Sequence, residues 1–169
     1  MLDKISKKIL MELQSDGRIS NVELAARVNL SPAACLERVR KLHESGYIMG
    51  YTAQLNPQLL DVSLLVFIEV VLDRTTPEVF DAFKHSVQII PEVLECHMVA
   101  GGFDYLVKAR VKDMAAYREF LGKTLLQKGV RETHTYAVME EVKNTTKLPI
   151  KCPRCSAPVF LIELSEQML

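Results

Sequence analysis

The segment RISNVELAARVNLSPAACLERVRKLHE, residues 18–44, decides the architecture of the first part of the chain. It predicts two short helices joined by a tight turn. Ser20 and Glu23 have the Ser-x-x-Glu spacing of a capping box, which marks the start of the first helix. Ser31 is the expected N-cap of the second helix. Pro32 fits the first position of that helix, because the N–H that proline lacks would have no partner there.

The second of these helices has two different faces. Four apolar residues recur at spacings of three and four, so we expect them to share a buried side. They are Cys35, Leu36, Val39 and Leu42. The opposite side begins with two alanines and continues with basic residues, which suits the major groove of DNA, because small side chains let a helix approach the bases. A solvated amphipathic helix is the alternative. The predicted DNA-contacting residues are Ser31, Ala33, Ala34, Glu37, Arg38, Arg40 and Lys41.

Other elements flank this helix pair. Residues 2–16 predict a further helix, which completes a three-helix unit. Residues 47–56 predict an extended segment, either a wing or a linking strand, and Asn56-Pro57 interrupts it. No residue pattern before residue 63 indicates catalysis.

From Ser63 onward the pattern changes to strands alternating with helices. The order is β-α-β-β-α-β, which is typical of the ferredoxin-like sandwich, so the fold class is α+β. The predicted strands are residues 63–73, 93–101, 104–112 and 130–142, and the predicted helices begin after Thr76 and Asp113. The first strand is apolar on both sides, and two helices cover only one face of a four-stranded sheet. We therefore expect a second subunit to cover the other face, as a homodimer.

Composition limits the class of protein. The 169 residues carry no formal net charge, and the part up to Gly50 carries +2. DNA binding would thus depend on local clusters and on oligomerisation. No run reaches the ~18 apolar residues of a membrane span, and the first residues lack the apolar core of a signal peptide, so we expect a cytoplasmic protein. The four cysteines are expected to be thiols.

The last part of the chain differs from the rest. Three prolines punctuate it, and Cys152-Pro-Arg-Cys155 is a CxxC motif before the apolar run 159–162. One CxxC supplies two of the four ligands of structural zinc, so two symmetry-related tails would be needed to complete a site. A reactive dithiol and a plain disordered tail are the alternatives, and no other metal ligands are predicted.

Several segments together closely resemble one family. They are LDKISKKILMELQSDGRISNVELAARVNLSPAACLERVRKL (2–42), GYTAQLNP (50–57), GGFDYL (101–106) and HTYAVMEEVK (134–143). They are similar to the Lrp/AsnC family of bacterial and archaeal transcription regulators, on its leucine-responsive branch. The resemblance implies a winged helix-turn-helix domain and a ligand-sensing domain. It also implies double-stranded DNA as partner, and dimers that assemble into tetramers or octamers.

The resemblance covers residues 2–148 and implies a division of the chain into four parts. These are a winged helix-turn-helix domain (1–50), a linker strand (51–62), a ferredoxin-like effector-binding and oligomerisation domain (63–148) and a C-terminal extension with the CxxC (149–169). The extension has no counterpart in the family.

The resemblance also implies an effector, a small amino acid such as leucine, and no other cofactor. Its pocket would form around the Gly-x-Phe/Tyr-Asp loop, whose backbone N–H groups can hold an α-carboxylate while Asp104 holds the α-ammonium. The implied effector-binding residues are Gly101, Gly102, Phe103, Asp104, Tyr105, Thr135, Tyr136 and Val138. Gly102 departs from the family, whose members usually have an acidic or polar residue there.

Two other classes of function compete with a DNA-binding regulator. An enzyme is not predicted, because the Gly-x-Ser-x-Gly, Walker and His-Glu-x-x-His motifs are absent, and adjacent Cys96 and His97 would point to opposite faces of a strand. The second alternative is a stand-alone amino-acid-binding oligomeric sensor without DNA contact. In that case the helix-turn-helix would have no use.

Overall fold

The computed structural model describes residues 2–122 and 129–151. They form two compact units, which are considered separately. Of these described residues, the first unit contains 2–53 together with 145–151, and the second contains those between 54 and 144.

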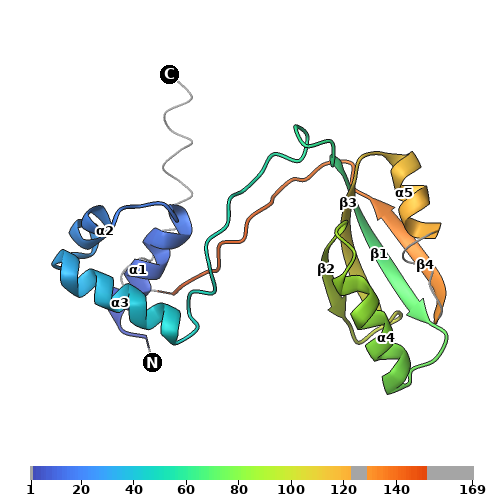
Figure 1. Cartoon of the computed structure of the whole chain (residues 1–169), viewed down its shortest axis with the longest axis horizontal. Helices are drawn as coiled ribbons and strands as arrows, with labels where there is room; N and C mark the ends of the chain where they lie inside the picture. The colour runs from blue at the N-terminus through green and yellow to red at the C-terminus, as the bar shows by residue number, and fades with distance from the viewer. Residues whose placement is uncertain (1, 123–128, 152–169) are drawn as a thin grey trace. The chain divides into compact units, whose positions relative to one another are not determined.

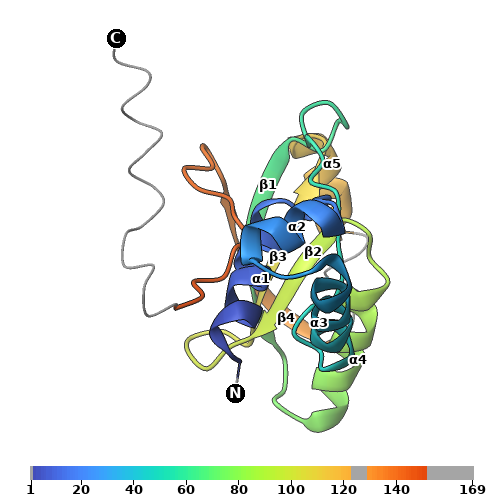
Figure 2. The same ribbon diagram turned by 90° about the vertical axis from the view of Figure 1, so that its left-hand side faces the viewer.

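Three helices form the first unit, as the sequence predicts. They are α1 (Lys4–Ser15), α2 (Asn21–Val28) and α3 (Pro32–Glu44). Figure 2 shows them lying against one another. One apolar cluster joins all three, and its fully buried members are Ile9, Leu24, Ala25, Val28, Cys35 and Leu42.

The expected linker strand is the first difference from the sequence prediction. Residues 51–62 contain no strand in the structure. An extended segment becomes a strand only where a neighbouring strand accepts its backbone hydrogen bonds, and the described residues offer this segment none. Tyr51 instead packs on the helical unit, with its ring 5.5 Å from that of His43 and one ring carbon close to Gly17.

The second unit has the predicted β-α-β-β-α-β order (Figure 1). Its elements are β1 (Leu64–Leu72), α4 (Pro77–Gln88), β2 (Val93–Met98), β3 (Tyr105–Val111), α5 (Met114–Phe120) and β4 (Val130–Ala137). The strands form one antiparallel sheet in the order β2-β3-β1-β4, so β1 lies between β3 and β4.

Alternation along the strands gives this sheet one core face. Val66, Ile68 and Val70 of β1 are wholly buried, and their register partners on β3 are buried as well. Both helices cover this face. Their buried contributions are Phe83 and Val87 of α4 and Tyr117 and Phe120 of α5.

The opposite face of the sheet is less apolar than the sequence suggests. Leu65 is buried and Phe67 is half-buried. Next to Phe67 in the register, however, lie Lys108 on β3 and Tyr136 on β4. Lys108 makes an ion pair of 2.8 Å with a glutamate of β2. Any surface that covers this face must therefore satisfy polar groups as well as apolar ones.

The last strand is shorter than predicted. The sequence predicts a strand over 130–142, whereas β4 ends at Ala137. Ala137 pairs with Val66, and the N–H of Val138 makes the last bond to the Leu65 carbonyl. Because the two strands are antiparallel, the residues that follow Val138 run past the first residue of β1, Leu64. No strand remains there for β4 to pair with.

Tyr105 provides a test of this core. Its side chain is 2% exposed, and its hydroxyl has no hydrogen-bond partner among the described residues. A buried polar group without a partner is destabilising, so Tyr105→Phe should raise the free energy of unfolding by about 1 kcal/mol. Tyr117→Phe is the matched control, because the Tyr117 hydroxyl bonds to Thr135 and its loss should be destabilising by a similar amount. Urea titrations measure both, and a drop in stability for Tyr105→Phe would contradict the assignment.

Candidate functional site

Side-chain caps fix the starts of α2 and α3. The Ser20 hydroxyl accepts from the N–H of Glu23 at 3.2 Å, and the Ser31 hydroxyl accepts from the N–H of Ala34 at 3.3 Å. Both predicted caps are confirmed. Asn29 ends α2 in the left-handed conformation, with φ 57°. These contacts present the N-terminal end of α3 to solvent, where Ser31, Ala33 and Ala34 are exposed.

The buried side of α3 is narrower than predicted. Cys35 and Leu42 are buried and Val39 is partly so, but the Leu36 side chain is 60% exposed. Successive helix residues are about 100° apart, so Leu36 lies outside a seam centred on Cys35. The prediction that Leu36 is buried is wrong. Instead, Leu36 belongs to the solvent-facing stripe of α3, which we define as Ala33, Leu36, Glu37 and Arg40.

Arg38 occupies a different position from the other predicted DNA contacts. Its guanidinium lies 2.6 Å from the carboxylate of Asp3 and 3.3 Å from the Ser6 hydroxyl. Asp3 is also the N-cap of α1, accepting from the Ser6 N–H. This Ser6 bond, with a further contribution from Arg38, lowers the pKa of Asp3 to about 2. The structure thus places Arg38 in a contact between α3 and α1.

Arg40 and Lys41 lie at the exposed end of α3 among carboxylates. Arg40 contacts Glu37 at 2.9 Å and Glu44 at 3.1 Å, and Lys41 lies 3.5 Å from Glu37. The hydrogen bond from Arg40 lowers the pKa of Glu37. Solvent-exposed ion pairs contribute little to stability, so both cations can exchange these partners for phosphates or bases at small cost.

The loop between β2 and β3 lines a cavity of about 340 Å³ in the second unit. Its walls are residues 71–75 at the end of β1, residues 101–104 of the loop, and Arg131 at the start of β4. Arg74 and Arg131 line this cavity and are exposed, and Asp73 and Asp104 line it as well, so it offers both cations and carboxylates. Such a hollow, with two guanidinium groups and glycine N–H groups, is suited to a carboxylate.

Asp104 has a structural contact in this loop. One of its carboxylate oxygens accepts from the Leu72 N–H at 2.7 Å, and its own N–H donates to the Val70 carbonyl at 2.9 Å. These bonds tie the loop to the end of β1 and leave the second carboxylate oxygen available for another donor.

The other residues implied for the effector pocket do not line this cavity. Tyr105 is in the core, where its ring lies 4.6 Å from that of Phe83. Thr135 pairs in register with Ile68, and Tyr136 pairs with Phe67 on the opposite face. Their partners on β1 lie several residues before Leu72, so Thr135, Tyr136 and Val138 lie farther along β4 than the loop.

Arg74 and Arg131 were not among the predicted site residues. The order of the strands in the sheet indicates that both residues lie near the glycine loop. In the order β2-β3-β1-β4, the end of β1 meets the starts of both β3 and β4. A basic residue just after the first strand and another at the start of the last strand therefore belong beside the glycine loop.

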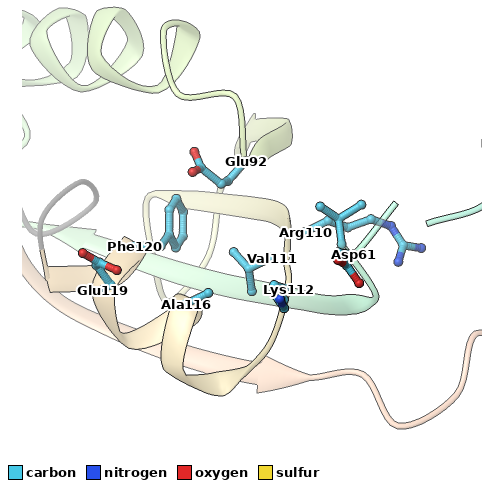
Figure 3. A pocket seen from close by; sticks show the side chains of 9 residues that line it. Asp61, Glu92, Arg110, Val111, Lys112, Ala116, Glu119 and Phe120 are labelled. Atoms are coloured by element: carbon cyan, nitrogen blue, oxygen red, sulfur yellow. The ribbon is translucent and has the colours of Figure 1, made fainter. Parts of the chain in front are cut away.

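A second cavity, of about 330 Å³, lies at the other end of β3 (Figure 3). Its apolar wall comes from Val111, Ala116 and Phe120, and carboxylates of Glu92 and Glu119 lie around it. The Arg110 guanidinium is engaged elsewhere, with the Ser63 carbonyl and Glu141.

Other kinds of site find no support among residues 2–122 and 129–151. No cluster of three His, Cys, Asp or Glu residues could hold a metal ion, and no helix could cross a membrane. Burial raises the pKa of the Cys35 and Cys96 thiols, which disfavours the reactive thiolate. The CxxC of Cys152 and Cys155 and the run 159–162 lie outside the described residues.

Comparison with known proteins assigns a class to each unit. A sequence model described as winged helix-turn-helix DNA-binding matches residues 2–49. A second, described as the Lrp/AsnC ligand binding domain, matches residues 65–148. The chain is 60% identical over 151 residues to the leucine-responsive regulatory proteins of Klebsiella pneumoniae and Escherichia coli K12, covering 89% of this chain and 92% of each relative.

Solved structures agree. A transcriptional regulator of Neisseria meningitidis in complex with L-Met superposes with a TM-score of 0.84 at 41% identity, covering 88% of this chain and 97% of that one. An AsnC family transcriptional regulator from Agrobacterium tumefaciens has the same TM-score and coverage at 32% identity.

The contact between Arg38 and Asp3 predicts a pH dependence. Asp3→Asn keeps a good N-cap but removes the charge, so it should lower the unfolding free energy by up to about 1 kcal/mol at pH 7. Because the pKa of Asp3 is lower in the folded state than in the unfolded chain, this contribution is present above pH ~4 and is lost as the pH falls through 2. Denaturant unfolding between pH 7 and pH 2 measures it. If the unfolding free energies of variant and parent differ by the same amount at pH 7 and at pH 2, the ion pair is contradicted.

Proposed function

The chain belongs to the Lrp/AsnC family of transcriptional regulators, and from this premise we propose that it is a sequence-specific DNA-binding regulator that responds to a small amino acid such as leucine. It acts by binding and not by catalysis, since its relatives are regulators. Residues 1–50 bind DNA, residues 63–148 bind the effector and the partner subunits, and residues 51–62 link them.

The exposed stripe of α3 is the observation that carries the DNA-binding part of this proposal. The stripe runs from Ala33, which follows the Ser31 cap, to Arg40. None of its side chains belongs to the buried core, so the stripe is free to enter a groove. Ser31, Ala34 and Lys41 border it and complete the proposed contact surface. A stand-alone sensor, the second function considered, has no use for such a surface.

The cavity beside the glycine loop is the proposed effector site. Arg74 and Arg131 attract the α-carboxylate, and the free oxygen of Asp104 accepts from the α-ammonium. Gly101, Gly102 and Phe103 form the remaining wall. The Neisseria relative was solved with L-Met, an amino acid of similar size and polarity to leucine, which supports this class of ligand.

Assembly is proposed to use the open face of the sheet. Its half-buried Phe67 and Val71 remain partly exposed in a single subunit, and Glu69 and Tyr136 already form a hydrogen bond of 3.2 Å across that face. A second copy can cover the apolar groups while such internal bonds keep the polar groups satisfied. Dimers formed this way are the proposed units of a tetramer or octamer, and Thr135 and Val138 are proposed to approach the effector from a neighbouring subunit.

Arg40 provides the test of DNA binding. Arg40→Ala should weaken binding to a selected DNA duplex by roughly 1–3 kcal/mol if the side chain contacts a base, and by less if it contacts phosphate. Lys41→Ala should have a similar or smaller effect. Lys84→Ala is the matched control, because Lys84 is an exposed cation of α4 paired with Asp81, so its loss should leave affinity unchanged. Gel-shift titrations that show parental affinity for both α3 variants would refute the assignment.

The effector site is tested with leucine and three variants. Arg131→Ala should weaken the leucine-dependent rise in Tm, corresponding to a loss of affinity of about ten-fold, because a charged hydrogen bond is removed. Asp104→Asn keeps an acceptor for the Leu72 N–H, so it should retain the parental Tm but lose the leucine response, whereas Asp104→Ala should lose both. Arg118→Ala, on the exposed side of α5, is the control. A normal response in Arg131→Ala and Asp104→Asn would place the site elsewhere.

A further inference from the structure

Leu36 is the exposed large apolar side chain of α3. It is 60% exposed and takes no part in the apolar cluster that joins the three helices. A single exposed leucine is ordinary on a protein surface, so exposure alone indicates nothing. Its position is informative, however, because Leu36 lies in the middle of the solvent-facing stripe, one turn after Ala33 and one turn before Arg40.

The charges around Leu36 cancel one another. Arg40 is paired with Glu37 and Glu44, and the stripe carries no cation between Ala33 and Arg40 that would hold a phosphate. What this part of the helix offers to a groove is a short Ala33 side chain, a protruding Leu36 and the carboxylate of Glu37. The only apolar group on the base edges of the major groove is the C5-methyl of thymine.

We propose that Leu36 is a specificity-determining residue that selects thymine by packing against its C5-methyl group in the major groove. This inference rests on the proposed DNA-binding function and goes beyond it by naming the base and the chemical group. The small Ala33 lets the helix approach closely enough for contact, and Arg40 anchors the far end of the stripe.

The test uses a thymine analogue that lacks only the methyl group. The full-length protein first selects its tightest-binding duplexes from a random-sequence pool, and each thymine of one such duplex is then replaced singly by deoxyuridine. At one or two positions the parent protein should bind the deoxyuridine duplex about four-fold more weakly, because one methyl contact is lost. Pairing and backbone charge do not change, so the effect reports the methyl alone.

Variants at position 36 then assign the contact. Leu36→Ala should bind the thymine duplex more weakly and show nearly the same affinity for the thymine and deoxyuridine duplexes at those positions. Leu36→Met, which keeps an apolar side chain of similar length, should restore most of the discrimination. Leu59→Ala, another leucine with a largely exposed side chain outside α3, should keep the parental discrimination.

Two results would overturn the inference while leaving DNA binding intact. One is binding of selected duplexes with no sensitivity to deoxyuridine at any position. The other is an unchanged deoxyuridine penalty in Leu36→Ala, which would assign the methyl contact to another residue. Failure of the parent protein to select any duplex would overturn the proposed DNA-binding function itself, and this inference with it.

Discussion

The pairing of β1 with a strand on each side is the constraint on which the second unit depends. Because β1 lies between β3 and β4 and its core face is wholly buried, a slip of one residue would expose Val66, Ile68 and Val70 together. The fixed register brings the end of β1, the glycine loop and Arg131 together at one end of the strands. The proposed effector site therefore follows from the packing of the core.

Packing of the core also constrains the helical unit, but it uses only one side of α3. Only a narrow seam of α3, centred on Cys35 and Leu42, is needed to join it to α1 and α2. Arg38 reinforces the edge of that seam through Asp3, at the very start of α1. Val39 also packs on this cluster, whereas Ala33, Leu36 and Arg40 on the solvent-facing stripe take no part in it, so these side chains are free to be selected for binding rather than for stability.

Local signals explain which features could be predicted from the sequence. The caps at Ser20 and Ser31 depend on residues three apart, so the helix starts were predicted correctly. The burial of Leu36 was predicted wrongly, because spacing alone does not say how wide a helix face its neighbours cover. The C-terminal end of β4 and the expected strand at 51–62 depend on which partner strand is available. Arg131 enters the site only through the sheet order.

The chain path imposes one more condition on any response to an effector. A ligand changes DNA binding only if it stabilises one arrangement of the helical unit over another. β4 begins at the proposed effector cavity, and the same segment continues to residues 145–151, which group with the helices. There Gln14 of α1 holds Leu148 by two bonds, accepting from its N–H at 2.6 Å and donating to its carbonyl at 3.2 Å. A displacement of β4 at Arg131 would thus reach α1 through the backbone up to Leu148 and then through the two hydrogen bonds to Gln14, so we expect the residues between Ala137 and Leu148 to contribute to an effector response.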